Sequence, residues 1–224
     1  MSTLYAIPTP LGGEPQEVLS PSTIQTIRGL RHFVVENAKS ARAFLGALGM
    51  PVRELIIEEI GNDHLRGDDI GLLSEAGCPA IADPGAALIE AAHAKGYKVV
   101  PLVGPSSIVM ALMASGLEGQ RFAFCGYLPR EAVDRKKRIK ELENRSKRED
   151  ETEIFIETPY RNDALLGALL ESCQPQARLC VAIDLTLPSE SVTTKTVAEW
   201  RRTKAAIGRR PAVFLLYLDP PRRA

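Results

Sequence analysis

Residues 73–85 read LSEAGCPAIADPG and directly continue an apolar run, IGLL, at residues 70–73. The run predicts a strand at 70–74, and the glycines and prolines that follow predict a tight loop, because glycine permits close backbone approach and proline fixes loop shape. Two further glycine- and proline-rich turns, at 8–13 and 104–107, also follow predicted strands. Any one of them alone is best explained as a strand-to-helix connection. Three such turns at one edge of an α/β sheet predict a ligand site, since ligands bind outside the carboxyl ends of the strands.

Around this loop, short apolar runs alternate with stretches of helical periodicity. Strands are predicted at residues 4–7, 32–36, 70–74 and 98–102, and helices at 22–30, 40–48, 85–95 and 108–115. This alternation is typical of a mainly parallel sheet with helices on both faces. We therefore expect an α/β fold for this part of the chain.

The residue pattern of the sequence changes after Ser115-Gly116-Leu117-Glu118-Gly119. We interpret this segment as the boundary between two domains, residues 1–117 and 118–224. Beyond this boundary, strands are predicted at 122–127, 154–157, 179–184 and 212–217, and a helix at 164–173. The second domain is expected to hold a mixed sheet with flanking helices.

Composition and charge describe an ordinary globular chain. Of the 224 residues, 45% are apolar and 25% charged, and the formal net charge is zero, which argues against nucleic-acid binding through global charge but not through a local basic patch. The four cysteines form no C-x-x-C pair and the three histidines show no ligand spacing, so no metal site is expected. There is no apolar run of membrane-spanning length and no signal-peptide pattern at the start, so we expect a cytoplasmic protein without a membrane partner.

The loop sequences do not fit the common phosphate-binding motifs. Neither G-x-G-x-x-G nor G-x-x-x-x-G-K-[ST] occurs in the chain, which disfavours a nucleotide held through its phosphates. The turns suit a ligand held by backbone amides and carbonyls, with apolar side chains against a flat ring.

Several segments, taken in order along nearly the whole chain, resemble the tetrapyrrole methylase superfamily. They are LYAIPTPLG at 4–12, LSEAGCP through DPG at 73–85, VVPLVGPSS at 99–107, ASGL at 114–117, GYLP at 126–129 and ETPYR at 157–161. Within the superfamily, the sequence is most similar to the branch of bacterial 16S ribosomal RNA cytidine 2′-O-methyltransferases. Residues 157–161 resemble that branch's Glu-Ser-Pro-His-Arg.

The resemblance implies a two-domain α/β fold that binds S-adenosylmethionine in the cleft between the domains and forms a homodimer. Carried over by position, the cofactor-binding residues are Pro8, Ser74, Ala76, Gly77, Cys78, Ile81, Ser106, Ser107, Ile108, Leu128, Ala182, Leu185, Pro211 and Ala212, with Ala182 and Leu185 as alternatives for one contact. The segment 8–12 and Glu36 would face the methyl acceptor.

The sequence departs from that branch on the acceptor side. The branch carries Glu-Asp-Thr-Arg after the second strand, whereas this chain has Glu36-Asn37-Ala38-Lys39. An acidic group and an arginine able to grip phosphate bidentately are both replaced, and Lys39 offers only a point charge. The connection between residues 57 and 70 is also shorter. These changes bear on the acceptor more than on the cofactor.

Methyl transfer from a sulfonium requires mainly that a nucleophile be held in line with the sulfur–methyl bond and that water be excluded. A ribose hydroxyl is helped by a base, for which Glu36 is the first candidate and Glu157 the second. A glutamate at a strand end is, however, more often a solvated or helix-capping residue. Asp83 is expected to cap a helix that begins at Pro84.

Two clusters of basic residues could bind an anionic partner. The stretch 135–148 could grip RNA phosphates, or form a solvated helix with ion pairs at i,i+4 spacing, and its interleaved acids favour the second interpretation slightly. A cluster at 201–210 adds some weight to an anionic partner.

Three functions therefore remain open. The first is a methyltransferase acting on a ribosomal RNA ribose 2′-hydroxyl. The second is a methyltransferase acting on a tetrapyrrole or another small molecule, against which Pro10-Leu11-Gly12 and Gly77-Cys78-Pro79 count. The third is a non-catalytic module that binds S-adenosylmethionine.

Overall fold

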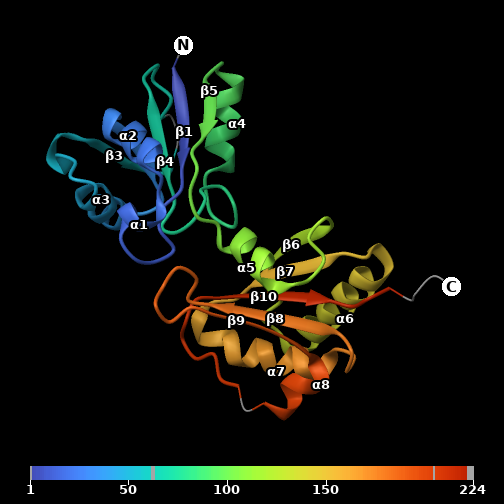
Figure 1. The fold of residues 1–224 in the computed structure, drawn as a ribbon. Helices are drawn as coiled ribbons and strands as arrows, with labels where there is room; N and C mark the ends of the chain where they lie inside the picture. Colours follow the sequence, from blue (N-terminus) through green and yellow to red (C-terminus); the bar gives the residue numbers. More distant parts are fainter. Residues whose placement is uncertain (1, 62–63, 204, 221–224) are drawn as a thin grey trace. The chain divides into compact units, whose positions relative to one another are not determined.

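The computed structural model describes residues 2–61, 64–203 and 205–220. The chain divides into two compact units, one up to Ser106 and one from Ser107 on, and each is built around its own sheet (Figure 1). The boundary between the two compact units lies before the helix at 107–115, because that helix packs on the second sheet. The division of functions between residues 1–117 and 118–224 stays a prediction.

The first unit is an α/β layer structure. Its elements are β1 (Thr3–Ile7), α1 (Pro15–Val18), α2 (Pro21–Gly29), β2 (His32–Val35), α3 (Ala38–Ala47), the 3₁₀ turn η1 (Val52–Glu54), β3 (Ile56–Glu59), β4 (Ile70–Leu73), α4 (Ala86–Ala94) and β5 (Lys98–Pro101). The strands lie in the order β3-β2-β4-β1-β5, and all neighbouring pairs are parallel. The parallel sheet predicted from strand–helix alternation is confirmed.

Helices cover both faces of this sheet. Ile27 of α2 and Leu45 of α3 pack with Phe33 on one face. Leu88 of α4 packs with Val34 on the other. Phe33 and Val34 are successive residues of β2, so their side chains point to opposite faces, and both are fully buried. Strands buried on both faces are mainly apolar, which is why residues 33–35 of β2 are recognisable as an apolar run.

The second unit contains a mixed sheet. Its elements are α5 (Ser107–Ser115), β6 (Phe122–Tyr127), α6 (Ala132–Glu149), β7 (Thr152–Ile156), η2 (Pro159–Arg161), α7 (Asn162–Ser172), β8 (Arg178–Ile183), β9 (Ser191–Thr196), α8 (Val197–Arg202) and β10 (Ala212–Tyr217). The order is β6-β7-β10-β8-β9, with β6 and β7 parallel and the other pairs antiparallel. The main core joins α6, α7 and α8 to one face through residues such as Leu142, Leu169, Trp200 and Phe214.

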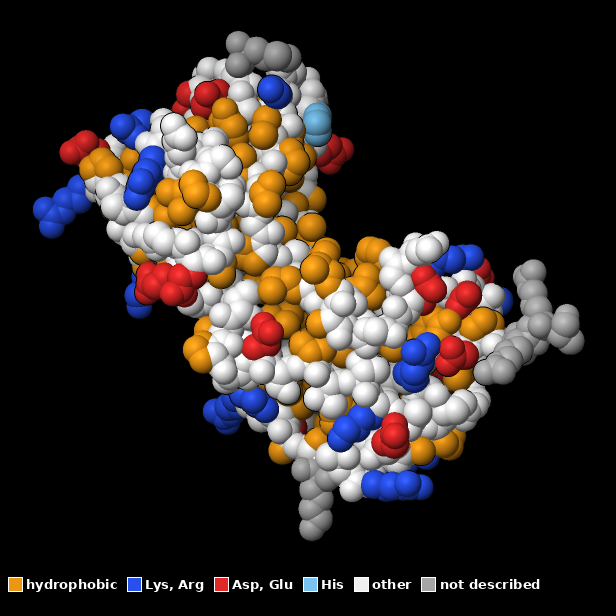
Figure 2. Space-filling model, in the orientation of Figure 1, with side chains coloured by type: hydrophobic (Ala, Val, Ile, Leu, Met, Phe, Trp, Pro, Cys, Tyr) orange, Lys and Arg blue, Asp and Glu red, His pale blue; other side chains and the backbone are white. Residues whose placement is uncertain are grey.

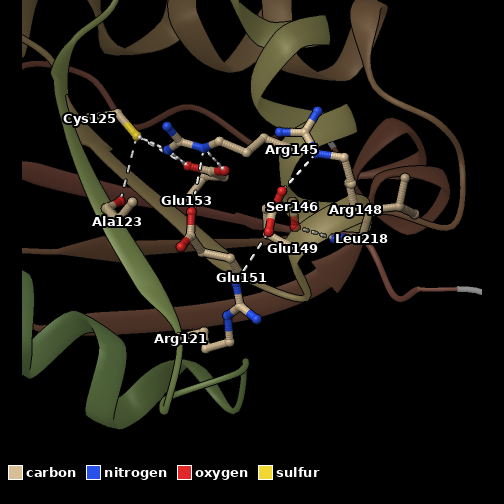
Figure 3. A network of polar contacts seen from close by, with 10 residues as sticks. All are labelled: Arg121, Ala123, Cys125, Arg145, Ser146, Arg148, Glu149, Glu151, Glu153 and Leu218. Atoms are coloured by element: carbon tan, nitrogen blue, oxygen red, sulfur yellow. Dashed lines mark hydrogen bonds and ion pairs between the residues drawn. The ribbon is translucent and has the colours of Figure 1, made fainter.

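The charged stretch at 135–148 lies within α6, and ion pairs occupy most of its basic side chains. The pairs are Lys136–Glu171, Arg138–Glu141, Lys140–Glu143, Arg145–Glu151 and Arg148–Glu149. The expected i,i+4 spacing is wrong: the pairs within the helix are i,i+3 or adjacent, and others reach different elements. Arg145 also donates to the buried Glu153 and to the Cys125 thiol, so it joins α6 to β7 and β6 (Figure 3). The contacts support the structural interpretation of this stretch.

Within the described part of the chain, no helix has the length and apolar composition needed to cross a membrane.

Candidate functional site

The first unit has a topological switch point between β1 and β4. After β1 the chain crosses over β4 to reach β2, whereas after β4 it crosses over β1 to reach β5. Because crossovers between parallel strands share one handedness, the two connections run to opposite faces of the sheet, and ligands of open α/β sheets bind at such a point. The loops at this point are residues 8–13 and 74–85, which are two of the three segments that the sequence singles out.

Backbone hydrogen bonds join these two loops directly. The amide of Thr9 donates to the carbonyl of Gly77 at 2.9 Å, and the amide of Gly77 donates to the carbonyl of Thr9 at 3.0 Å. The Thr9 hydroxyl donates to the Ser74 carbonyl at 3.3 Å. Gly77 has φ +75°, so a side chain at this position would be strained. The sequence does not single out Thr9, since only its bridge to a loop far along the chain marks it.

The third loop packs against the other two. A Cβ added to Gly104 would lie 2.5 Å from the Cβ of Pro8, so only glycine allows this approach. The Cys78 thiol lies 3.5 Å from the carbonyl oxygen of Pro105, and burial raises the pKa of this thiol, which keeps it neutral. The structure therefore brings together Pro8, Ser74, Gly77, Cys78 and the loop that leads to Ser106.

The joined loops leave small and apolar groups exposed. Ala76 is exposed and Ile81 is 49% exposed, whereas Ser74 is buried and its hydroxyl donates to the Gly77 carbonyl. Ala80 and Ala82 both have positive φ values, a strained conformation that is concentrated at functional sites. An exposed apolar surface of this kind suits a flat ring with polar edges.

Three carboxylates lie beside this loop cluster. Glu36 follows β2, and its Oε2 accepts a hydrogen bond from the amide of Glu75 at 3.1 Å. Burial, together with the charges of Glu36 and Glu75, raises the pKa of Asp83 to about 6. The expected capping role of Asp83 is wrong, because α4 begins at Ala86 and its N-cap is Gly85, which makes no side-chain cap.

The segment that departs from the ribosomal branch has a structural role. Asn37 is the N-cap of α3, and its Oδ1 accepts hydrogen bonds from the amides of Lys39 and Ser40 at 2.9 and 3.4 Å. Asparagine and aspartate cap helices about equally well. The change of charge at this position therefore preserves the helix start, and Lys39 lies exposed in its first turn.

In the second unit, the remaining residues lie at one end of the sheet. The carboxyl ends of β6, β7 and β8 and the amino end of β10 share this edge, because β10 runs antiparallel to β7 and β8. The edge carries Leu128 after β6, Glu157 after β7, Ala182 and Leu185 at the end of β8, and Pro211 and Ala212 at the start of β10. Ala212 pairs with Ile183, and Ser107 and Ile108 begin α5 in the same unit.

Glu157 is buried and largely committed to its own turn. Its Oε1 accepts hydrogen bonds from the amide of Thr158 at 2.6 Å, from the Thr158 hydroxyl at 3.1 Å and from the Arg161 guanidinium. Among the described residues, its Oε2 has no hydrogen-bonding partner. The carboxylate therefore holds the ETPYR turn, and any further role rests on a single oxygen.

The structure also adds residues that the sequence does not indicate. Asn162 and Asp163 at the start of α7 bind the backbone of residues 207–210, which lead into Pro211. No local motif marks them, since their partners lie more than 40 residues along the chain.

A cavity of about 260 Å³ in the first unit lies against α4, and none of the predicted site residues lines it. It is lined by Ile60, Gly61, His64, Leu65, Gly85, Ala87, Leu88, Ala91 and Lys95.

Comparison with known proteins identifies the family. The model of the family "Tetrapyrrole (Corrin/Porphyrin) Methylases" matches residues 18–200. The chain is 33% identical over 205 residues to "Ribosomal RNA small subunit methyltransferase I" of Xylella fastidiosa, covering 88% of this chain and 73% of that protein. It is 30% identical to the protein of the same name from Neisseria meningitidis serogroup B, covering 96% and 76%.

Solved structures show the same fold at low sequence identity. The methyltransferase CobJ superimposes with a TM-score of 0.64 at 17% identity, covering 100% of this chain and 97% of that one. Diphthine synthase gives a TM-score of 0.65 at 17% identity, covering 96% and 90%. The family match, the strand-end loops and the fold lead to one conclusion: the chain belongs to the tetrapyrrole methylase family and is a methyltransferase that uses S-adenosylmethionine.

Proposed function

We propose that this chain transfers a methyl group from S-adenosylmethionine to a ribose 2′-hydroxyl of small-subunit ribosomal RNA. The observation that carries the proposal is the convergence of three glycine- and proline-rich loops at the switch point of a parallel sheet. The acceptor is inferred from the relatives named ribosomal RNA small subunit methyltransferase I. A ribosomal RNA acceptor implies that the reaction takes place in the cytoplasm.

Both groups of strand-end residues are proposed to bind the methyl donor. In the first unit these are Pro8, Ser74, Ala76, Gly77, Cys78, Ile81 and Ser106, and in the second Ser107, Ile108, Leu128, Ala182, Leu185, Pro211 and Ala212. The bound donor supplies a sulfonium methyl group that is intrinsically reactive. The protein then has to orient the acceptor and exclude water, tasks for which loops with small side chains and accessible backbone are suited.

Glu36 is our first candidate for the base that accepts the hydroxyl proton. It is partly exposed beside the loop cluster, and the hydrogen bond from the Glu75 amide orients its carboxylate. Glu157 comes second, because its Oε1 already accepts from Thr158 and Arg161. We expect Glu36→Gln to slow methyl transfer by roughly 10²-fold while leaving donor affinity unchanged.

We further propose a homodimer, for which the second unit offers exposed apolar side chains. Val109 and Met113 of α5 are 48% and 79% exposed, and Phe122 and Tyr127 of β6 are 44% and 54% exposed. Figure 2 shows hydrophobic side chains gathered over this part of the unit. Exposed apolar patches often mark protein–protein interaction sites. Sedimentation analysis of the chain and of Met113→Glu tests this: a dimer that the variant weakens is expected, and a monomer in both would contradict it.

The cofactor proposal is tested by calorimetric titration with S-adenosylmethionine and S-adenosylhomocysteine, alongside Cys78→Trp. An indole at this position would occupy the space between the second and third loops, where the thiol now contacts Pro105. Saturable binding to the chain, lost in a variant that remains folded by circular dichroism, is expected. Failure of the folded chain to bind either compound would contradict a donor site.

The acceptor is tested by incubating the chain with labelled S-adenosylmethionine and unmethylated small-subunit RNA. Label in one ribose 2′-O-methyl nucleotide, abolished by Cys78→Trp, is expected. Label only in a tetrapyrrole or another small molecule would replace the acceptor. Donor binding without transfer to any of these would favour a non-catalytic binding module.

A further inference from the structure

The start of α7 holds the loop that leads into β10. The Nδ2 of Asn162 donates to the carbonyl of Arg210 at 2.7 Å, and Asn162 is fully buried. The carboxylate of Asp163 accepts from the amide of Ile207 at 2.7 Å and from the amide of Gly208 at 3.3 Å. Two successive side chains therefore bind three backbone groups of one short loop.

The same loop is tied to the end of β8. The Arg210 guanidinium lies 3.7 Å from the Oδ2 of Asp184, and its Nε donates to the carbonyl of Ile207 at 2.9 Å. The amide of Asp184 donates to the carbonyl of Pro211 at 3.1 Å. Residues 207–211 are thus held from both sides, by α7 and by β8.

These contacts hold a loop that has no regular secondary structure of its own. The loop contains Gly208 with φ +68°, and a free loop would have to lose conformational entropy when a ligand orders it. Contacts that order the loop beforehand remove that cost from binding. Because Pro211 and Ala212 directly follow, the position of their backbone depends on Asn162 and Asp163.

We propose that Asn162 and Asp163 are positioning residues for the methyl donor: they preorganise residues 207–211 so that Pro211 and Ala212 present their backbone to it. This inference rests on the proposed role of Pro211 and Ala212. The two residues act through the loop and do not touch the reacting atoms.

The test compares Asn162→Ala with a matched control at the other end of β10. There, the buried Ser146 accepts a hydrogen bond from the amide of Leu218 at 2.9 Å, so Ser146→Ala also removes one buried side-chain-to-backbone bond. Both variants should lose a few degrees of Tm, because each removes a hydrogen bond between a buried side chain and a backbone group. Titration with S-adenosylmethionine, well below both Tm values, should show Kd raised roughly tenfold in Asn162→Ala and changed less than twofold in Ser146→Ala.

Asp163→Ala provides a second variant if Asn162→Ala does not fold, since Asp163 is exposed and its loss removes the contacts to Ile207 and Gly208 without opening the core. It too should weaken donor binding more than Ser146→Ala. Normal affinity in folded Asn162→Ala and Asp163→Ala, with the unsubstituted chain binding the donor, would overturn the positioning role alone. If the unsubstituted chain binds no donor, the proposed function fails and this inference fails with it.

Discussion

The two units place their candidate site residues at strand ends, but they hold those ends in different ways. In the first unit, the loops contact one another directly: the backbones of Thr9 and Gly77 exchange hydrogen bonds, and Gly104 lies against the Pro8 ring. In the second unit, side chains hold the backbone: Asn162 and Asp163 bind the loop before β10. Backbone packing needs particular small residues at particular places, whereas side-chain bracing needs partners that are distant in sequence.

The two ends of the sheet in the second unit also differ from one another. The end at Glu157 carries the candidate site, whereas the end at Thr152 carries the network of Arg145, Glu153 and Cys125 (Figure 3). The charged contacts at the second end join α6 to β6 and β7 and include none of the candidate site residues. Substitutions can therefore separate stability from donor binding.

The largest effect on stability is expected from Arg145→Ala. Glu153 is fully buried, and removing its guanidinium partner leaves a buried charge unpaired, which costs about 3 kcal/mol for a pair with one partly exposed member. Donor affinity of the folded protein should not change. Denaturant unfolding and calorimetry together check this, with Arg148→Ala, which removes an exposed pair with Glu149, as the near-neutral control. A loss of affinity in Arg145→Ala would show that the two ends are not independent.

Gly104→Ala is expected to lower the free energy of unfolding of the first unit by about 2 kcal/mol, because the new Cβ would overlap Pro8 and force the loops apart. Unlike Arg145→Ala, it should also weaken donor binding by at least tenfold. Gly119→Ala, where an added Cβ meets nothing within 4 Å, is the matched control. Unchanged affinity in a folded Gly104→Ala variant would mean that the approach of these loops does not shape the site.

This contrast explains what the sequence can predict. The strands buried on both faces are long apolar runs, so β1, β2, β4, β8 and β10 can be located. Of the edge strands, β5 (KVVP) and β6 (FAFCGY) can be located as well, whereas β3 (IIEE) and β9 (SVTTKT) are not found, since charged or hydroxyl side chains make up most or half of their residues. Helix α8 is absent from the predicted elements as well, although its capping box of Thr196 and Glu199 is a signal that could reveal it.

The candidate site divides in the same way. Glycine and proline mark the loops of the first unit locally, so Gly77 and its neighbours can be named from the sequence. Asn162 and Arg210 cannot, because their contact joins residues 48 positions apart. The helix cap expected at Asp83 is wrong because the sequence does not reveal that α4 begins at Ala86.

Asp83→Asn is expected to have a smaller effect on the free energy of unfolding, on the order of 1 kcal/mol after allowing for partial exposure of the side chain. Burial and the neighbouring Glu36 and Glu75 raise the pKa of Asp83 from 3.8 to about 6. The folded state therefore favours the protonated acid, and this contribution to stability is complete below pH 3.8 and is lost as the pH rises through 6. Asp83→Asn should be the more stable protein at about pH 8 and should lose that advantage toward about pH 4. Thermal unfolding across this range measures the difference, and a pH-independent difference would contradict the raised pKa.

We propose that loops at the strand ends of each sheet bind the methyl donor. Hydrogen–deuterium exchange with and without S-adenosylmethionine tests it most directly. We predict slower exchange in peptides covering residues 74–85 and 205–212, and no change in those covering the Arg145–Glu153 network. Protection confined to other segments, such as α4 beside the cavity, or no protection at saturating donor, would contradict this proposal.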